Sequence, residues 1–182
     1  MEKNRVCPVE LAGGLDNKIR RFIQNPGKIV LPYIKEGMSV LDLGCGVGFF
    51  TVEIAKLTGS SGKVIAADLQ QGMLDKINNK ISGSALDKII KLHKCGGNKI
   101  GLEEKVDFVF AFYVIHEIPD QENFFREIYT FIKPGGQMLI VEPPLHVSKK
   151  GFKSMTDIIE SIGFKIIDRP KFFGNKSVLI MK

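Results

Sequence analysis

Three glycines follow one short apolar stretch of the chain and recur at every second position. Residues 41–48 read LDLGCGVG, which places Gly44, Gly46 and Gly48 after a predicted strand and at the start of a predicted helix. Because glycine has no Cβ, a turn of this composition lets the backbone approach a flat, extended ligand closely. We therefore expect these glycines, with Cys45 inside the turn, to form a ligand-binding loop.

The spacing of this turn and the carboxylate before it distinguish between two ligands. Dinucleotide-binding turns place their third glycine five residues after the first, where this chain has Phe49. Asp42, two positions before Gly44, would repel a pyrophosphate, whereas S-adenosylmethionine carries an ammonium and a sulfonium that tolerate nearby negative charge. The charge argument favours this methyl donor over NAD. In the alternative interpretation, Asp42 only accepts hydrogen bonds from loop amides and does not select the ligand.

A second carboxylate ends the next predicted strand. Asp68 follows the turn by about 20 residues, where doubly wound folds place an acidic side chain that accepts hydrogen bonds from ribose hydroxyls. The alternative is that Asp68 caps the following helix, but its spacing from the glycine turn favours ribose binding. Leu69 would then flank the adenosine.

The end of the fourth predicted strand carries side chains that could act on a substrate. Ligands in open α/β sheets bind outside the carboxyl ends of the strands, and Tyr113, His116 and Glu117 fall there. Phe112, directly before them, is predicted to contact the cofactor. Methyl transfer is an in-line displacement that needs alignment more than a base. If a base is used, His116 has the side chain best matched to neutral pH. The alternatives are that His116 bonds the loop or lies against the cofactor, and that Tyr113 contacts the cofactor without doing chemistry.

Further acidic residues lie near the same edge of the predicted sheet. Glu142 ends the fifth predicted strand and is a candidate for the rim of the pocket, with solvent exposure as the alternative. Glu117 and Asp120 are interpreted as caps of the next helix. These acidic residues could therefore belong to the pocket or have only a structural role.

Short apolar runs rich in β-branched residues alternate with amphipathic segments of helical length from Met38 onward, which is typical of an α/β fold with a parallel sheet. The strands are predicted at 39–43, 63–67, 89–93, 106–114, 137–141, 164–168 and 177–181, and the helices at about 48–57, 71–81, 123–132 and 150–162. The connection between the last two strands is too short for a parallel crossover, so these strands are predicted to form a hairpin.

The chain length of 182 residues predicts a single domain, residues 1–182. Its first 37 residues are rich in proline and glycine around an amphipathic piece, 15–24, and are predicted to be a lid or cap, or else structural padding at the edge of the sheet. Arg20 and Arg21 in that piece could bind an anionic substrate or the cofactor carboxylate, or be solvated.

Composition and charge limit the partners. The net charge of +6 comes from lysines scattered through the chain, which favours a solvated surface over a nucleic-acid partner. The three cysteines form no C-x-x-C pair, so neither a disulfide framework nor a metal site is expected. No apolar run approaches the roughly 20 residues that span a bilayer, and the N-terminus lacks a secretory signal. We expect a cytoplasmic protein without a membrane partner, and the sequence is compatible with a homodimer.

Four segments occur in a specific order along the chain. They read VLDLGCGVG at 40–48, VIAAD at 64–68, VDFVFA at 106–111 and IKPGG at 132–136. This series resembles the ordered motifs of class I S-adenosylmethionine-dependent methyltransferases, in the small-molecule branch that includes ubiquinone/menaquinone-biosynthesis methyltransferases. The resemblance covers roughly residues 28–142, and four ordered motifs are more specific than any one of them.

The resemblance implies a Rossmann-like, doubly wound and mostly parallel seven-stranded sheet with an antiparallel last strand. It implies that the turn glycines and Asp42 contact the methionine part of the cofactor, that Asp68 contacts the ribose, and that the loop after the third strand contacts the adenine. Many relatives have an acidic residue followed by a small one in that loop, whereas this chain reads HKCGG at 93–97. A backbone carbonyl of Cys95 or Gly96 is therefore the predicted adenine contact.

The predicted function is S-adenosylmethionine-dependent methyl transfer to a small-molecule acceptor. The alternatives are a non-catalytic, cofactor-binding partner subunit and methylation of a nucleic acid or a protein. The Asn/Asp-Pro-Pro-aromatic signature of amino methylation is absent after the fourth strand, where the chain reads YVIH at 113–116. The identity of the acceptor is not encoded in these motifs.

Overall fold

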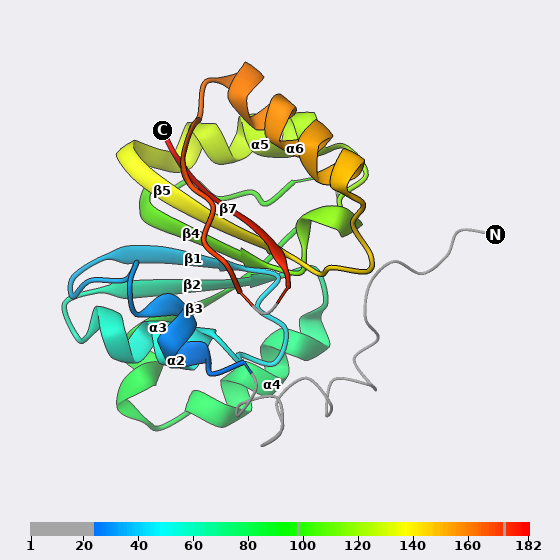
Figure 1. The fold of residues 1–182 in the computed structure, drawn as a ribbon. Helices are drawn as coiled ribbons and strands as arrows, with labels where there is room; N and C mark the ends of the chain where they lie inside the picture. The colour runs from blue at the N-terminus through cyan, green and yellow to red at the C-terminus, as the bar shows by residue number, and fades with distance from the viewer. Residues whose placement is uncertain (1–23, 98, 173) are drawn as a thin grey trace. The chain divides into compact units, whose positions relative to one another are not determined.

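The computed structural model describes residues 24–97, 99–172 and 174–182 (Figure 1). The chain divides between Cys95 and Gly96 into two units, which are described separately. Arg20 and Arg21, considered as possible ligands of an anionic substrate or of the cofactor carboxylate, lie outside the described residues.

The first unit is built on three parallel strands. In chain order, its described elements are α2 (Pro26–Val30), β1 (Ser39–Leu43), α3 (Thr51–Thr58), β2 (Lys63–Asp68), α4 (Gln71–Ile81), η2 (Ala85–Lys88) and β3 (Ile90–Lys94). The strand order is β3-β2-β1, and both pairings are parallel. Nearly all of β1 and β2 is buried, and apart from Asp42 and polar residues at the strand ends their sequences are apolar at successive positions instead of alternating ones.

The two longer helices of this unit show how far local patterns predict structure. Helix α4 begins and ends where its helical spacing predicts, and its buried side chains are Met73, Leu74, Ile77 and Ile81. Helix α3 begins at Thr51, later than the predicted Gly48, because Gly48 has a φ of 80° and belongs to the preceding turn. The glycine segment therefore ends before α3 begins.

The second unit combines parallel and antiparallel strands. Its elements are β4 (Val106–Phe112), η3 (Ile115–Glu117), α5 (Gln121–Phe131), β5 (Ile132–Glu142), α6 (Lys149–Ile162), β6 (Lys165–Asp168) and β7 (Lys176–Met181). The strand order is β4-β5-β7-β6, with β4 and β5 parallel and β7 antiparallel to both of its neighbours. The predicted hairpin of the last two strands is confirmed. Figure 1 shows α5 and α6 side by side, and the two helices pack against each other.

Strand β4 is shorter than its apolar sequence predicts. It ends at Phe112, because Tyr113 has a φ of 65° and leaves the extended conformation. The chain then forms the short η3 turn. This early end places the backbone around His116 in a turn rather than in a strand.

The described residues form a seven-stranded sheet, mostly parallel and with an antiparallel last strand. The predicted α/β, Rossmann-like fold class is therefore confirmed. None of the helices described here has the length and apolarity needed to cross a membrane.

Candidate functional site

The glycine turn of the first unit adopts a conformation that requires glycine. Gly44, Gly46 and Gly48 have φ angles of 65°, 52° and 80°, all in the left-handed region. The amides of Gly44 and Cys45 both donate to the carbonyl oxygen of Ala67, at 2.8 and 3.1 Å. These hydrogen bonds fix the start of the turn against the end of β2.

Asp68 connects the end of β2 to this turn. One of its carboxylate oxygens accepts a hydrogen bond from the Gly46 amide at 3.0 Å, and the other accepts one from the Gln70 amide at 2.8 Å. Burial raises the pKa of this carboxyl, and the backbone hydrogen bonds oppose that shift. A carboxylate has about four acceptor positions, so these bonds leave capacity for ribose hydroxyls.

Asp42 is more deeply buried, with 3% of its surface exposed. It accepts a hydrogen bond of 2.6 Å from the hydroxyl of Thr51 in α3, so its partner is a hydroxyl and not the loop amide of the alternative interpretation. Burial raises the pKa of Asp42 to about 7, with Thr51 opposing the shift and the charge of Asp68 adding to it. A buried carboxylate is stabilised by a positive charge nearby, so this site fits a ligand that carries an ammonium group.

Three other predicted cofactor residues of the first unit differ in exposure. Cys45 is buried, and burial raises the pKa of its thiol well above the ordinary value, which makes it a poor nucleophile. Leu69 is 43% exposed and accessible to a flat ligand. Cys95 is half-buried, and its amide donates to the Asp68 carbonyl oxygen at 2.9 Å, directly after β3. Gly96 is exposed and begins the second unit.

Tyr113 stands in the second unit in a conformation that is uncommon for a tyrosine. Its amide donates to the Val141 carbonyl oxygen at 2.8 Å, and its hydroxyl donates to Oδ1 of Asn175 at 2.9 Å. Its ring packs on that of the buried Phe112, with the ring centroids 4.2 Å apart. Left-handed backbone in a bulky residue is strained and tends to occur at functional sites. Catalysis by Tyr113 and cofactor contact by Phe112 stay predictions.

His116 is held by a buried carboxylate on the neighbouring strand. Oε2 of Glu142 lies 2.5 Å from Nδ1 of His116, and Oε1 of Glu142 accepts a hydrogen bond of 2.9 Å from the Ile115 amide. Glu142 is fully buried, so the alternative that it is a solvent-exposed residue is wrong. The hydrogen bond to Glu142 raises the pKa of His116, partial burial opposes this, and the charges of Glu142 and Glu117 add to it.

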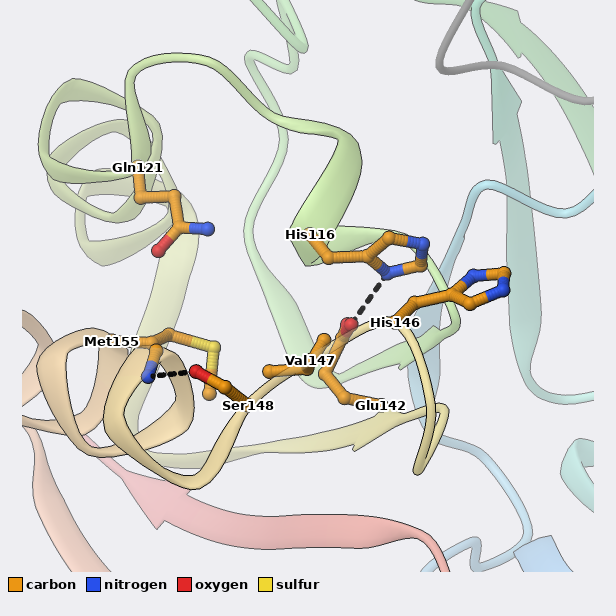
Figure 2. Close-up of a pocket in the computed structure, with 8 residues that line it drawn as sticks. His116, Gln121, Glu142, His146, Val147, Ser148 and Met155 are labelled. Carbon is orange, nitrogen blue, oxygen red and sulfur yellow. Dashed lines mark hydrogen bonds and ion pairs between the residues drawn. The ribbon is translucent and has the colours of Figure 1, made fainter.

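These two side chains line a pocket of about 230 Å³ that lies entirely in the second unit. Its lining residues are His116, Gln121, Glu142, His146, Val147, Ser148, Gly151 and Met155 (Figure 2). The imidazole rings of His116 and His146 have their centroids 5.7 Å apart. The lining combines hydrogen-bonding groups with a few apolar ones, which suits a small acceptor or the polar end of a larger one.

Sequence reasoning missed several of these lining residues. His146 and Ser148 follow β5, at the carboxyl end of a strand, so the rule used for His116 would also have indicated them. Gln121 and Met155 belong to α5 and α6 and have no such signal. Within the described part of the chain, no cluster of three or more His, Cys, Asp or Glu side chains suited to a metal ion was found.

Comparison with known proteins defines the class of this fold and site. A family model described as "Methyltransferase domain" matches residues 34–165. The chain therefore belongs to the methyltransferase domain family. This confirms the resemblance inferred from the four ordered motifs.

Two curated relatives carry more specific names. The chain is 36% identical over 127 residues to the demethylmenaquinone methyltransferase of Lactobacillus johnsonii, which covers 66% of this chain and 51% of the relative. It is 26% identical over 137 residues to the ubiquinone/menaquinone biosynthesis C-methyltransferase UbiE of Cronobacter sakazakii, covering 75% and 53%. The chain thus spans about half the length of these curated relatives.

Solved structures match the whole fold. A SAM-dependent methyltransferase from Aquifex aeolicus has a TM-score of 0.86 and 28% identity, and the match covers 97% of this chain and 99% of that one. A protein from Methanococcus maripaludis matches at a TM-score of 0.77 over 100% and 97% of the two chains, but at 18% identity it supports the fold alone. The family and the Aquifex protein confirm S-adenosylmethionine as the predicted cofactor.

Proposed function

We propose that this chain transfers a methyl group from S-adenosylmethionine to a small-molecule acceptor, with the cofactor held by the first unit and the acceptor by the pocket of the second. The observation that carries the proposal is the glycine turn that Asp68 fixes beside the buried Asp42. This combination offers close backbone approach together with negative charge, which suits a cationic ligand and disfavours a pyrophosphate.

Each predicted cofactor residue has one role in this proposal. Asp42 and the turn residues Gly44, Cys45, Gly46 and Gly48 hold the methionine part, and Asp68 accepts hydrogen bonds from the ribose. The adenine is bounded by Leu69 and by Cys95 or Gly96, and Phe112 adds an apolar contact. When bound, S-adenosylmethionine supplies a methyl carbon that its sulfonium makes electrophilic.

The acceptor is proposed to be a quinol-type ring, because the curated relatives are named for demethylmenaquinone and for C-methylation. Methylation at a ring carbon replaces a C–H bond by a C–C bond, so one proton must leave the acceptor. His116 is proposed to accept it, and its place in the pocket supports this role. Tyr113 is proposed to position the loop that carries His116, since its amide and hydroxyl bond Val141 and Asn175.

The finer statements about partners and location also belong to this proposal. We propose that the enzyme acts in the cytoplasm, without a membrane or nucleic-acid partner, either alone or as a homodimer. The scattered lysines support the proposal that there is no nucleic-acid partner, and the lack of a long apolar run supports the proposal that there is no membrane partner. Sedimentation of the purified chain would decide between monomer and dimer.

Two measurements test the function. Calorimetry should detect binding of S-adenosylhomocysteine and none of NAD, and tight binding of NAD alone would refute the cofactor assignment. In the second measurement, the chain should transfer tritiated methyl groups from S-adenosylmethionine to a short-chain demethylmenaquinol. The His116→Gln variant should have a kcat lower by about a hundredfold or more, while it still binds S-adenosylhomocysteine. Binding without turnover on any acceptor would instead support a non-catalytic subunit.

A further inference from the structure

We propose that Glu142 is a positioning residue that holds the imidazole of His116 in one tautomer, so that Nε2 is the nitrogen that accepts a proton in the pocket. This inference rests on the proposed function for its use in catalysis. Its structural part, the tautomer of His116, is testable without any acceptor.

Both carboxylate oxygens of Glu142 have a hydrogen-bond partner. Its Oε1 faces the Ile115 amide at 2.9 Å, and its Oε2 faces Nδ1 of His116 at 2.5 Å. A backbone amide can only donate, and an ionised carboxylate can only accept. If Glu142 acts as an acceptor at both oxygens, Nδ1 carries the proton of the neutral imidazole and the lone pair is on Nε2.

The turn that carries the imidazole is anchored by two hydrogen bonds to Ile115. Both main-chain polar groups of Ile115 are hydrogen-bonded: its amide donates to Glu142, and its carbonyl oxygen accepts a hydrogen bond of 3.0 Å from Nε2 of Gln121. Figure 2 shows the second ring nitrogen of His116 on the side of the ring away from Glu142. The side chain of His116 is 20% exposed and that of Glu142 only 1%, so the pair has one accessible member.

Charged and titratable groups approach the imidazole from several elements. Glu142 approaches from β5, Glu117 lies on the same short turn, and His146 lies in the loop after β5. The bond to Glu142 and the charges of Glu142 and Glu117 raise the pKa of His116, while burial lowers it. A raised pKa makes Nε2 a stronger base and stabilises the imidazolium that forms when a proton arrives.

The chemical step conserves atoms and electrons. The electron pair for the new C–C bond would come from the acceptor ring, while the bond between the methyl carbon and sulfur would break and leave its electron pair on sulfur, giving S-adenosylhomocysteine. The ring C–H bond then breaks, its electron pair returns to the ring, and its proton moves to Nε2. The imidazolium then donates from both nitrogens, and Glu142 compensates its charge across the Nδ1 bond. Loss of the Nε2 proton to water restores the starting state.

The decisive experiment is nitrogen NMR of the chain labelled with ¹⁵N-histidine, with and without the Glu142→Gln substitution. The chain has three histidines, so His93→Gln and His146→Gln variants assign the spectrum. In the unsubstituted protein we expect Nδ1 to be protonated and Nε2 not. A protonated Nε2 in neutral His116 would overturn the proposal, and this spectrum decides the matter even if the variant does not fold.

The Glu142→Gln variant should invert the tautomer for a specific reason. The Ile115 amide still needs an acceptor, so the oxygen of the new side-chain amide turns toward it and the NH₂ group turns toward Nδ1. Nδ1 then becomes the acceptor, Nε2 becomes protonated, and the pKa of His116 falls. An unchanged tautomer in a folded Glu142→Gln variant would refute a positioning role.

Glu117→Gln is the matched control, because it removes a carboxylate near His116 that takes no part in the hydrogen bond to Nδ1. It should leave the tautomer unchanged and lower the pKa of His116 less than Glu142→Gln does. Binding of S-adenosylhomocysteine serves as the folding control for both variants. A tautomer change in Glu117→Gln equal to that in Glu142→Gln would count against a specific role for Glu142.

With the demethylmenaquinol acceptor, Glu142→Gln should lower kcat by about ten- to a hundredfold with little change in KM. The acidic limb of its pH–rate profile should move to lower pH, because the pKa of His116 falls. An unshifted limb would contradict the inference. If no acceptor is turned over, the proposed function fails, while the tautomer still decides the role of Glu142.

Discussion

Asp68 and Glu142 are both buried carboxylates at the ends of strands, yet they do different work. Asp68 uses its two oxygens on two backbone amides, those of Gly46 and Gln70. Glu142 uses one oxygen on the Ile115 amide and the other on a side chain, His116. The first arrangement fixes a stretch of backbone, and the second orients a group that can gain and lose a proton.

The same difference distinguishes the glycine turn of the first unit, which would act through its main chain, from the pocket of the second unit, which would act through its side chains. In the glycine turn, the surface proposed to bind the cofactor is main chain, so its shape depends on φ angles and on the carboxylate of Asp68 that supports it. In the pocket of the second unit, side chains of a turn, a strand and a loop supply the chemistry. Substitutions in the turn should therefore change cofactor affinity, and substitutions in the pocket should change proton transfer.

The largest expected effect on cofactor affinity is that of Gly48→Ala. Its φ of 80° strains an alanine, and the added Cβ would lie 3.1 Å from Cγ1 of Ile77. We expect S-adenosylhomocysteine affinity, measured by calorimetry, to fall by about a hundredfold. Gly83→Ala is the control, because Gly83 has a similar φ of 73° but open space around the new Cβ. Equal losses of affinity in both variants would show that the turn is not specifically involved.

Asp68→Asn should have the next largest effect. An asparagine has one side-chain acceptor, so either the Gly46 or the Gln70 amide would face an NH₂ group instead of an oxygen. We expect a loss of roughly 2 kcal/mol in unfolding free energy from chemical denaturation and about a thirtyfold loss of affinity. The exposed Asp75→Asn in α4 should change neither. A fully stable Asp68→Asn variant would contradict the supporting role of Asp68 in the turn.

A smaller effect is expected from pH, through Asp42. Its pKa is raised from 3.8 to about 7, so its ionisation opposes folding, and the stability of the ligand-free chain should fall as the pH rises from about 4 to about 7. The ionised form attracts a cationic ligand, so affinity for S-adenosylhomocysteine should rise by about tenfold between pH 6 and pH 8. Calorimetry between pH 6 and pH 8 should show that the affinity of Asp42→Asn for S-adenosylhomocysteine changes less with pH than that of the unsubstituted protein. The same slope in both proteins would exclude Asp42 as its source.

The smallest expected effect belongs to the second unit. Tyr113→Phe removes the hydroxyl that donates to Asn175, which should lower the unfolding free energy by about 1 kcal/mol without changing S-adenosylhomocysteine affinity. A double-mutant cycle with Asn175→Ala should recover a coupling of similar size. A coupling near zero would show that this hydrogen bond does not hold the loop, and a loss of cofactor affinity would break the division between the two regions.

Much of the fold was predictable because its signals are local. Helix α4 has the predicted bounds because its apolar spacing is complete within one segment, and the final hairpin follows from a short connection. The end of β4 was not predictable, because the apolar sequence continues past Phe112 and only the left-handed Tyr113 ends the strand. The cofactor contacts of Leu69, Cys95, Gly96 and Phe112 stay predictions.

The sequence by itself determined the glycine turn, the two carboxylates that flank it and the class of cofactor, because these residues act through backbone conformation and ordered spacing along one βαβ unit. Only the tertiary structure decided that Glu142 is buried and hydrogen-bonded to His116, from which it is separated by 26 positions in the sequence. Strand pairing brought these two side chains together, and pairing between separate strands leaves no periodic signal in the sequence. The turn therefore indicates the cofactor, and the fold defines the candidate base.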